Sequence, residues 1–537
     1  MRPSLAIRAR RALVRLLPWT AALLLPGCAT SWRGPRTADE AALARPPLGE
    51  RTVLDHRLDR QRAGAPAGTS GVAALATGED ALYARLAMIE LAGRSIDVQT
   101  YIWDLDHSGR LILGRLLAAA DRGVRVRVLL DDTATFRNER MFAAVDRHPN
   151  LQVRLFNPFR TRPGDTWVER TIEFAADFRR LNRRMHNKQW IFDGGWTIVG
   201  GRNVADHYFL LAEDLNFRDL DLLAAGPVAA DSSAAFDRYW NSRWAVPIGD
   251  LAHARDRRLA RARRALERFE ASQERIPYAS RPTPETAGAA FDRIVPELYW
   301  APVELLVDEP GKVGESESTT SVIAERLRGE TALLGEELLV EVAYLALPEA
   351  TTDELARLVE RGVRVRMLTN SLATNDVVAA HSGYVSTRRR LLEAGVELHE
   401  LRPGGHDTGR FLHPSRRSRA SLHSKVLVFD RRHLFVGSLN LDPRSVVLNT
   451  EIGLFVDAPP VAAEVARRLE RGYDPAYSWK VELQTQQVRT SGGPIERQRV
   501  VWTGDPERPL RTREPRASTW RRLLAWLLAR LPLESQI

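Results

Sequence analysis

Two related stretches decide the fold: Ser421-Leu-His-Ser-Lys-Val-Leu-Val-Phe-Asp-Arg-Arg-His-Leu-Phe-Val-Gly-Ser-Leu-Asn440 and, earlier in the chain, Met185-His-Asn-Lys-Gln-Trp-Ile-Phe-Asp-Gly-Gly-Trp-Thr-Ile-Val-Gly-Gly-Arg-Asn203. Each has a His, one residue and a Lys, then four residues and an Asp, and it ends on Gly-Gly or Gly-Ser, one residue and an Asn. Such a recurrence of type and spacing is far beyond chance. The chain therefore contains an internal repeat.

The surroundings of each copy predict a strand, helix and strand unit. In the first half these are residues 95–102, 108–123 and 124–130, and in the second half residues 338–344, 352–360 and 361–368. The offset between the halves is nearly constant: 362 − 123 = 239 for a glycine and 423 − 186 = 237 for the histidine. Such units are the crossovers of a parallel sheet, so we predict an α/β fold made by tandem duplication.

Each motif also predicts a hairpin, with strands at residues 189–192 and 196–199 and at residues 426–429 and 434–436. Side chains two apart on a strand share a face, so each His should point the same way as its Lys. The glycine turns that follow would let backbone N–H groups and an Asn amide approach an anion.

Two imidazoles, two ammonium groups and two Asn-bearing turns form a set suited to one phosphodiester. The lysines would bind nonbridging oxygens and stabilise negative charge that develops at phosphorus. One His can attack phosphorus to give a phosphohistidine, while the other protonates the leaving alkoxide and deprotonates the incoming alcohol. No metal or cofactor is required, and neither half has a carboxylate cluster with magnesium-like or zinc-like spacing.

Length and charge limit the number of domains and the class of binding partner. A chain of 537 residues is long enough for two or three domains. It has 78 Lys and Arg against 68 Asp and Glu, which suits phospholipid headgroups or nucleic acid and does not choose between them. A GC-rich genome that writes Arg for Lys would give the same excess.

The N-terminus has the layout of a secretory signal, with arginines, an apolar run over residues 16–25, and then Pro26-Gly27-Cys28. The sequence Leu25-Pro-Gly-Cys28 resembles a bacterial lipobox, although Pro26 stands where a small residue is usual. It predicts a lipid-modified Cys28 in a membrane-anchored lipoprotein of the bacterial cell envelope that faces the periplasm, in the inner or the outer membrane. An ordinary signal peptide or a short anchor with an incidental Cys is the alternative.

The C-terminus predicts an amphipathic helix. Its apolar face consists of Trp520, Leu523, Leu524, Leu527, Leu528 and Leu531, and the opposite face of Arg521, Arg522, Ala525 and Arg530. It is too short to span a bilayer, so it would lie in the membrane interface or dock on the protein's own core. The charged residues 250–274 predict a helix between the halves.

The twin His-x-Lys-x4-Asp motifs, each with its Gly-(Gly/Ser)-x-Asn extension, resemble the signature of the phospholipase D superfamily. The resemblance implies an α/β fold with two tandem phospholipase D-like domains, each a mixed β-sheet flanked by helices, related by a pseudo-twofold axis with one shared active site. The implied site residues are the catalytic His186, Lys188, Asp193, His423, Lys425 and Asp430, the phosphate-binding Asn203, Ser438 and Asn440, and the histidine-orienting Asp219 and Glu451.

The residues do not support all of these roles equally. Asp193 and Asp430 complete the motifs but usually order the hairpin turn. Asp219 aligns with Glu451, since 451 − 219 = 232. Gly201 stands where the family more often has Ser. The residues themselves leave open which histidine attacks, and family analogy favours His186 as nucleophile and His423 as acid.

The expected organisation follows from these features. The predicted segments are a signal peptide at 1–28, a tether at 29–74, the first domain at 75–245, an interdomain helical segment at 246–330, the second domain at 331–485, and a C-terminal extension with a basic amphipathic helix at 486–537.

Longer segments are similar to the C-type bacterial cardiolipin synthases, among them residues 95–103, 181–188, 369–376 and 441–445. This resemblance implies a phosphatidyltransferase that makes cardiolipin from phosphatidylglycerol and a second phospholipid, such as phosphatidylethanolamine, through a phosphohistidine at a membrane surface. A hydrolytic phospholipase D that releases phosphatidic acid would use the same residues. Only the net positive charge supports a secreted nuclease, and we expect no nucleic acid partner.

Overall fold

The structure is a computed structural model that describes residues 51–135, 137–162, 166–252, 255, 257–272, 284–314, 321–404, 418–490, 493–505 and 509–530. The predicted signal peptide, Cys28 and the first part of the tether lie outside the described residues, as does Leu531. Among the described residues, no helix is both long and apolar enough to cross a bilayer.

The first half forms a mixed sheet with the order β10-β1-β8-β6-β5-β2-β3-β4-β9. Its strands are β1 (Ser70–Leu75), β2 (Ser95–Thr100), β3 (Arg125–Asp131), β4 (Leu151–Phe156), β5 (Gln189–Phe192), β6 (Trp196–Gly200), β8 (Asp221–Ala225), β9 (Ala245–Pro247) and β10 (Tyr299–Ala301). The strands β2, β3 and β4 run parallel, and β5 pairs with β2 in the antiparallel sense. The predicted crossover and hairpin of this half are thus confirmed.

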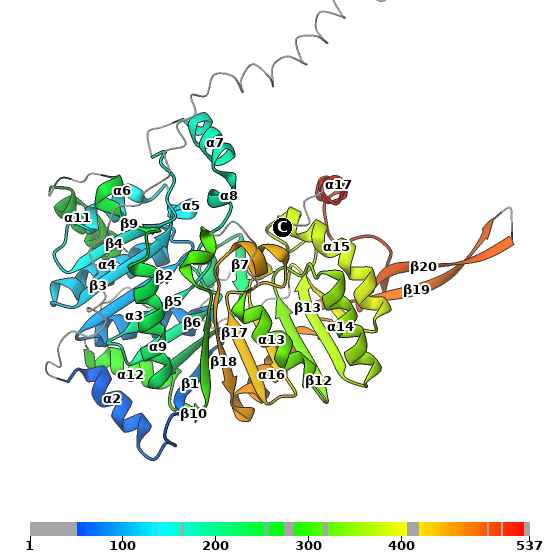
Figure 1. The fold of residues 1–537 in the computed structure, drawn as a ribbon, viewed down its shortest axis with the longest axis horizontal. Helices are drawn as coiled ribbons and strands as arrows, with labels where there is room; N and C mark the ends of the chain where they lie inside the picture. Colours follow the sequence, from blue (N-terminus) through cyan, green and yellow to red (C-terminus); the bar gives the residue numbers. More distant parts are fainter. Residues whose placement is uncertain are drawn as a thin grey trace, which may run out of the picture. The chain divides into compact units, whose positions relative to one another are not determined.

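Helices cover both faces of this sheet (Figure 1). The helices of this half are α2 (Val53–Arg62), α3 (Gly78–Leu91), α4 (His107–Asp121), α5 (Asp132–Thr135), α6 (Glu139–Val145), α7 (Trp167–Ala176), α8 (Phe178–Leu181), η2 (Asp206–Tyr208), α9 (Pro227–Trp240), α10 (Ile248–Leu251), α11 (Arg257–Ser272) and α12 (Pro284–Ile294). Leucines and alanines of α3 and α4 pack on Val126, Val128 and Leu130 of β3. The alternate residue Arg127 faces α9, with its guanidinium over Phe236.

The second half repeats the arrangement in the order β11-β18-β17-β16-β12-β13-β14-β19-β20-β21. Its strands are β11 (Val303–Val307), β12 (Glu337–Val342), β13 (Arg364–Asn370), β14 (Glu397–Leu401), β16 (Lys425–Phe429), β17 (His433–Gly437), β18 (Ile452–Asp457), β19 (Ser478–Thr490), β20 (Gly493–Thr503) and β21 (Leu510–Arg511). Its helices are η3 (Pro310–Val313), α13 (Val322–Ala332), α14 (Glu349–Glu360), α15 (Val378–Glu393), η4 (Arg444–Leu448), α16 (Pro459–Gly472) and α17 (Thr519–Leu528).

Local sequence explains why the two crossovers match. Gly123 and Gly362 end α4 and α14 with φ values of +93° and +90°, a left-handed conformation that favours glycine. Both chains then enter a parallel strand, β3 or β13, that is buried and rich in apolar residues. Gly123 and Gly362, which are 239 positions apart, therefore end equivalent helices in the two halves.

The two halves meet through a shared core and a pair of strands. Val199 and Leu222 of the first sheet pack in one apolar cluster with Val426 and Val436 of the second. Between the sheets, β7 (Leu215–Arg218) pairs in parallel with β15 (Arg419–Leu422). The predicted fold class, an α/β protein with two similar mixed-sheet halves, is confirmed.

The structure adds strands where the sequence predicted none. β1 lies at the end of the expected tether and pairs with β8. β10 and β11 lie within the expected interdomain helical segment and pair with β1 and β18. β19 and β20 continue past residue 485 into the expected C-terminal extension. The strands β1, β10 and β11 were missed because runs this short carry little periodic signal.

Candidate active site

Both motif histidines stand at the same edge of their sheets. β5 is antiparallel to β2 and β16 is antiparallel to β12, with Gln189 opposite Gln99 and Lys425 opposite Val342. His186 and His423 precede β5 and β16, so both lie where a parallel strand ends. The carboxyl edge of parallel strands is where α/β proteins commonly bind ligands.

The pairing of β7 with β15 places a carboxylate from the first half beside the histidine of the second. Arg218 is the partner of Leu422 in the ribbon, and the next residues are Asp219 and His423. The His423 Nδ1 lies 2.8 Å from Asp219 Oδ2, and its backbone N–H donates to the Arg218 carbonyl at 2.9 Å. His423 is thus held by the first half of the chain.

The second pair has the reverse arrangement. Met185 forms a parallel bridge with Thr450, and the backbone N–H of His186 donates to the Thr450 carbonyl at 2.9 Å. His186 Nδ1 consequently lies 2.9 Å from Glu451 Oε2. Each histidine therefore pairs with the carboxylate of the opposite half, an exchange that the alignment of Asp219 with Glu451 did not predict.

The motif lysines are buried beside these pairs. Lys188 Nζ donates to the carbonyl oxygen of His186, and Lys425 Nζ donates to that of His423. Burial lowers the pKa of Lys188 well below its ordinary value, and the charge of Lys425 lowers it further. Because a lysine of the second half acts on one of the first, the two motifs share one electrostatic environment.

The histidines are held neutral. Burial lowers the pKa of His186 well below 6.5, and the charges of Lys188 and Lys425 act in the same direction. Burial, and then the charge of Lys425, lowers the pKa of His423 to about 4. A neutral imidazole whose Nδ1 faces a carboxylate keeps Nε2 for chemistry.

The two carboxylates differ. Burial opposes ionisation of Asp219, but the hydrogen bond and charge of His423 outweigh it and lower its pKa below the ordinary value. Burial raises the pKa of Glu451 to about 7, against the opposing charge of Lys188. The first carboxylate is therefore ionised at neutral pH, whereas the second is poised between its two forms.

The glycine turns meet the two carboxylates differently, and the hydrogen bond from Ser438 lowers the pKa of Glu451 against the larger effect of burial. The Ser438 hydroxyl donates to Glu451 and accepts from the backbone N–H of Ile452 at 3.0 Å. Gly201 occupies the equivalent position, where an added Cβ would lie 2.3 Å from Asp219 Oδ1. The departure from the family's Ser thus makes room for Asp219.

The predicted phosphate contacts of the turns are only partly available. The backbone N–H groups of Gly201 and Ser438 donate to the carbonyls of Leu220 and Ile452. The Asn203 amide donates to the Tyr208 hydroxyl at 2.8 Å and accepts from Ile102 N–H at 3.1 Å. The buried Asn440 side-chain oxygen, in contrast, has no hydrogen-bond partner among the described residues.

Asp193 and Asp430 lie away from the histidines. Asp193 accepts hydrogen bonds from the backbone N–H groups of Gly93, Arg94 and Ser95 at 2.7–3.0 Å. Asp430 does the same for residues 335–337. Each Asp lies seven positions from its His along an extended chain, roughly 20 Å. Both aspartates therefore organise the starts of β2 and β12, the turn-ordering role that the sequence analysis gave as usual for them.

Aromatic and basic residues that the sequence analysis did not single out complete the surroundings. Tyr101 meets the His186 ring edge-on at 5.2 Å, and Tyr208 meets the His423 ring edge-on at 4.9 Å. The Arg444 guanidinium donates to Asn182 at 2.8 Å, and its charge contributes to the lowered pKa of His186. Arg444 falls in a segment that carried the family resemblance, and this was the available signal.

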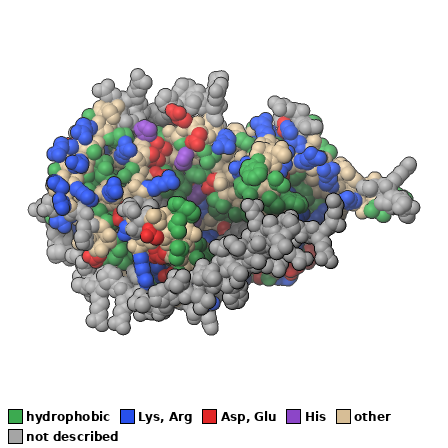
Figure 2. All heavy atoms as spheres, turned by 90° about the horizontal axis from the view of Figure 1, so that it is seen from above, with side chains coloured by type: hydrophobic (Ala, Val, Ile, Leu, Met, Phe, Trp, Pro, Cys, Tyr) green, Lys and Arg blue, Asp and Glu red, His purple; other side chains and the backbone are tan. Residues whose placement is uncertain are grey.

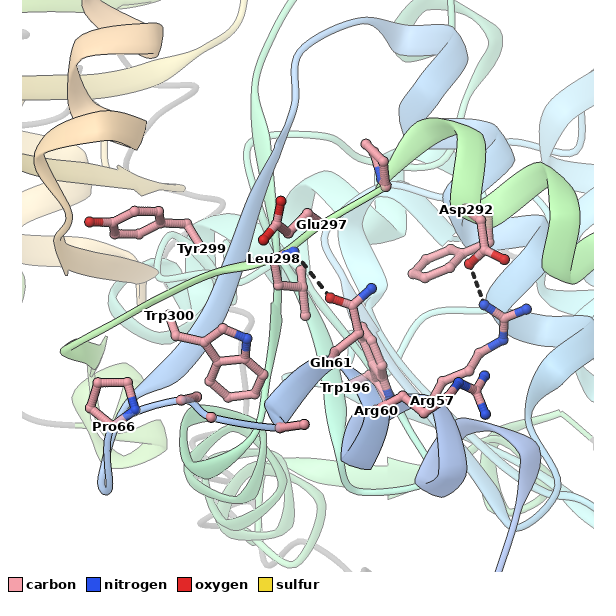
Figure 3. Close-up of a pocket in the computed structure, with 15 residues that line it drawn as sticks. Arg57, Arg60, Gln61, Pro66, Trp196, Asp292, Glu297, Leu298, Tyr299 and Trp300 are labelled. Carbon is pink, nitrogen blue, oxygen red and sulfur yellow. Dashed lines mark hydrogen bonds and ion pairs between the residues drawn. The ribbon is translucent and has the colours of Figure 1, made fainter.

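A cavity of about 650 Å³ lies elsewhere (Figure 3). Its lining includes Arg57 of α2, Trp196, Asp292 of α12 and Trp300. Trp196 begins β6 just after the turn that carries Asp193, so the cavity lies at the opposite end of the hairpin from His186. None of the predicted site residues lines it. Within the described part of the chain, no group of three or more His, Cys, Asp or Glu residues is placed to hold a metal ion.

Comparisons with known proteins agree with this geometry. The family model "Cardiolipin synthase, PLD-like domain" matches residues 86–240 and 334–473. The chain is 36% identical to cardiolipin synthase C of Escherichia coli over 87% of this chain and 96% of that protein. It is 30% identical to an uncharacterized Helicobacter pylori protein over 81% of this chain and 82% of that one. A phosphatidylserine synthase from Haemophilus influenzae has the same fold, with a TM-score of 0.52, 14% identity, and coverage of 79% of this chain and 91% of that one.

Proposed function

The chain belongs to the phospholipase D superfamily, in the family of cardiolipin synthases with a phospholipase D-like domain, and from this premise we propose that it is a phosphatidyltransferase that makes cardiolipin from phosphatidylglycerol and a second phospholipid. The observation that carries the proposal is the crossed pairing of His186 with Glu451 and of His423 with Asp219. Both pairs lie beside buried lysines that suit a phosphate group.

In the first step His186 Nε2 attacks the phosphorus of the donor lipid. A P–N bond forms, the P–O bond to the headgroup alcohol breaks, and His423 gives its proton to the leaving alkoxide. The bound anionic phosphate raises the pKa of His423 from its resting value of about 4, because an anion favours the imidazolium. Ionised Asp219 stabilises that cation through Nδ1.

The second step is the reverse displacement by a new alcohol. His423 Nε2 takes the proton of a phosphatidylglycerol hydroxyl, the alkoxide attacks phosphorus, and the P–N bond to His186 breaks. The product carries two phosphatidyl groups on one glycerol. Water in place of the alcohol would give phosphatidic acid, so exclusion of water decides between transfer and hydrolysis.

Lys188 and Lys425 would stabilise the charge on the nonbridging oxygens throughout. Their ammonium groups currently donate to the histidine carbonyls, and they would turn to the phosphate when it binds. Asn440 would donate to the phosphate through its side-chain NH2 group, because its unpartnered side-chain oxygen is an acceptor. Asn203 and Ser438 act one step away, by fixing Tyr208 and Glu451.

Reconstitution tests the function. The full chain is incorporated into vesicles of phosphatidylglycerol, with and without phosphatidylethanolamine, and the lipids are measured by mass spectrometry. We expect cardiolipin with release of free glycerol or ethanolamine, and no product with His423→Ala. Formation of phosphatidic acid without cardiolipin would contradict transfer and support hydrolysis.

We also propose that the chain is held at a membrane of the bacterial cell envelope through lipid on Cys28, facing the periplasm. The lipobox-like Leu25–Cys28 sequence supports this. The protein is recovered from membrane fractions of cells that express wild type or Cys28→Ser, and its N-terminal peptide is measured by mass spectrometry. The wild-type peptide should carry the mass of a diacylglyceryl group on Cys28, and the variant peptide should not. An identical, unmodified N-terminal peptide in both would contradict lipid attachment.

A further inference from the structure

We propose that α17 and the α7–α8 segment form a membrane-docking face on either side of the candidate site, and that its occupant is a bilayer of anionic phospholipid. This inference rests on the proposed function, because the bilayer is also the source of the substrate. It goes beyond that function in naming the surface that contacts the lipid and the residues that enter it.

The helix α17 docks through its small and basic side, which leaves its apolar side outward. Ala525 is buried against residues that include Leu372. The Arg521 guanidinium donates to the carbonyls of Leu372 and Asn375. Trp520 and Trp526 remain 67% and 52% exposed. A helix that served its own core would bury these tryptophans, so the orientation indicates an external apolar partner.

The attachment of α17 is firm. Glu514, just before the helix, forms a buried ion pair with Arg388 of α15 at 2.9 Å. The Arg522 guanidinium donates to the Glu514 carbonyl at 2.7 Å, and the Ser518 hydroxyl caps the helix start at 3.2 Å. The exposed tryptophans are therefore a fixed surface of the folded chain.

The segment α7–α8 presents a second apolar patch. Its outward residues are Trp167, Val168, Ile172 and Phe178, of which Trp167 is 78% exposed. A capping box at Thr166 and Glu169 begins α7, and Arg180 of α8 donates to the Asn157 side chain at 2.7 Å. Phe174 packs against Phe159 and Phe178, so these contacts hold the segment on the first half and leave Trp167 and Ile172 exposed.

Both patches belong to the edge that carries the histidines. The α7–α8 segment follows β4, and α17 docks on the connection that follows β13; these parallel strands end at the same edge as β2 and β12. In Figure 1 all three helices lie on the upper side of the sheets. Figure 2 looks onto that side, where hydrophobic side chains gather in patches with Lys and Arg around them.

Each patch is also connected to a site residue. Helix α8 ends at Leu181, five residues before His186. The loop under α17 carries Asp376, whose carboxylate accepts from the Tyr344 hydroxyl at 2.9 Å and acts on the pKa of Lys425. Lipid contacts at either patch would therefore lie near segments that carry or contact site residues.

Charge and geometry favour a bilayer over a protein. Residues 511–530 contain six arginines and one acidic residue. Arg521 and Arg522 contact the protein, whereas Arg513, Arg516 and Arg530 are exposed and match anionic headgroups. Exposed tryptophans among arginines suit the interface, where rings lie at headgroup depth. A protein that covered both patches would close the site between them, whereas a bilayer that contacts both supplies the headgroup to it.

A fluorescence experiment tests the face residue by residue. Cys28 is the only cysteine of the chain, so Cys28→Ser in the full chain permits single labels. An environment-sensitive fluorophore is placed at Leu527→Cys, Ile172→Cys or, as the matched control, Leu333→Cys, which is exposed to 79% on another element. With phosphatidylglycerol vesicles we expect a blue shift at positions 527 and 172, none at 333, and at least a fivefold smaller response with phosphatidylcholine.

Activity separates this inference from the proposed function. Trp520→Ser/Leu527→Ser and Trp167→Ser/Ile172→Ser should lower turnover on vesicles at least tenfold and leave turnover of monomeric short-chain phosphatidylglycerol unchanged. Failure of wild type on both substrates would instead contradict the proposed function. No blue shift at 527 or 172, an equal shift at 333, or a label shift caused by self-association without vesicles would overturn the docking face.

Discussion

The two histidines are related by the repeat, yet their surroundings differ. His186 faces Glu451, whose pKa burial raises to about 7, although Lys188 and the hydrogen bond from the Ser438 hydroxyl act in the opposite direction. His423 faces Asp219, whose pKa is lowered and whose neighbour in the turn is a glycine. One scaffold thus supplies one weakly charged and one firmly charged carboxylate.

This difference supports the proposed roles of the two histidines. The ionised carboxylate of Asp219 stabilises a cationic His423. The histidine that protonates the leaving group must be cationic before it gives up its proton. A poised carboxylate at Glu451 orients His186 without holding a proton on it, which suits a nucleophile. The crossed pairing also means that neither half forms a complete pair alone.

The largest effect should come from the histidines themselves. His186→Ala and His423→Ala should each lower cardiolipin formation by about 10³-fold or more, because nucleophile and acid are both needed. A donor that releases p-nitrophenolate, which leaves without protonation, should separate them. Its release should recover in a single-turnover burst with His423→Ala and stay absent with His186→Ala. Equal recovery in both variants would contradict the assigned roles.

Substitution of the two carboxylates should have the next largest effect on turnover. Asp219→Asn removes a full charge beside His423 and should lower turnover about 10²-fold or more. Glu451→Gln resembles the protonated form of Glu451, which is already populated at pH 7. This substitution should therefore lower turnover by no more than about tenfold. Both are measured as kcat and KM on vesicles. A greater loss for Glu451→Gln would reverse the comparison.

The turn residues should affect stability. Gly201→Ala places a Cβ on Asp219 and should lower the free energy of unfolding by about 1–3 kcal/mol. Ser438→Ala removes the hydrogen bond to Glu451 and the acceptor of the Ile452 N–H, and should cost about 1–3 kcal/mol. Urea unfolding followed by circular dichroism measures both. A Gly201→Ala variant as stable as wild type would show that the close packing of Asp219 is not as described.

The two histidine–carboxylate pairs should respond to acid in opposite directions. The folded pKa of His423 is about 4 against an ordinary 6.5, so its stabilisation is present above pH 6.5 and is lost as pH falls toward 4. The folded pKa of Glu451 is about 7 against an ordinary 4.5, so its stabilisation is present below pH 4.5 and is lost as pH rises through 7. Each contributes about 2 kcal/mol between pH 7 and pH 5.

Two variants separate these contributions. Relative to wild type, acidification from pH 7 to pH 5 should stabilise His423→Asn and destabilise Glu451→Gln, each by about 2 kcal/mol. Urea unfolding at both pH values provides the measurement. The same change in both variants would contradict the opposite pKa shifts.

The motif residues and hairpins could be predicted because their signals are local. Spacing alone placed His186 beside Lys188 and His423 beside Lys425, and the repeat predicted two similar halves. The crossed pairs could not be predicted. They depend on the pairings of β7 with β15 and of Met185 with Thr450, which join positions more than 200 residues apart, as 419 − 215 = 204 shows, and leave no periodic trace.

Other features depend on contacts between distant residues, which a sequence pattern does not specify. The residues of α17 predicted an amphipathic helix but not which side would dock, since that depends on the small face around Ala525 meeting Leu372. Asp193 and Asp430 matched the motif by spacing, but their positive φ values and backbone contacts place them at the far ends of the strands. The segment around Glu451 and Arg444 was recognisable by resemblance, without its partners.

Trapping the covalent intermediate tests the assignment of His186 most directly. His423→Asn is mixed with a phosphatidyl-p-nitrophenol donor, which permits attack but leaves no base for the second step, and the reaction is quenched and digested in alkali to preserve phosphohistidine. Mass spectrometry should find the phosphatidyl group on the peptide that contains His186, and His186→Asn should give no adduct. An adduct on His423 in the His186→Asn variant, or none in either, would contradict the account.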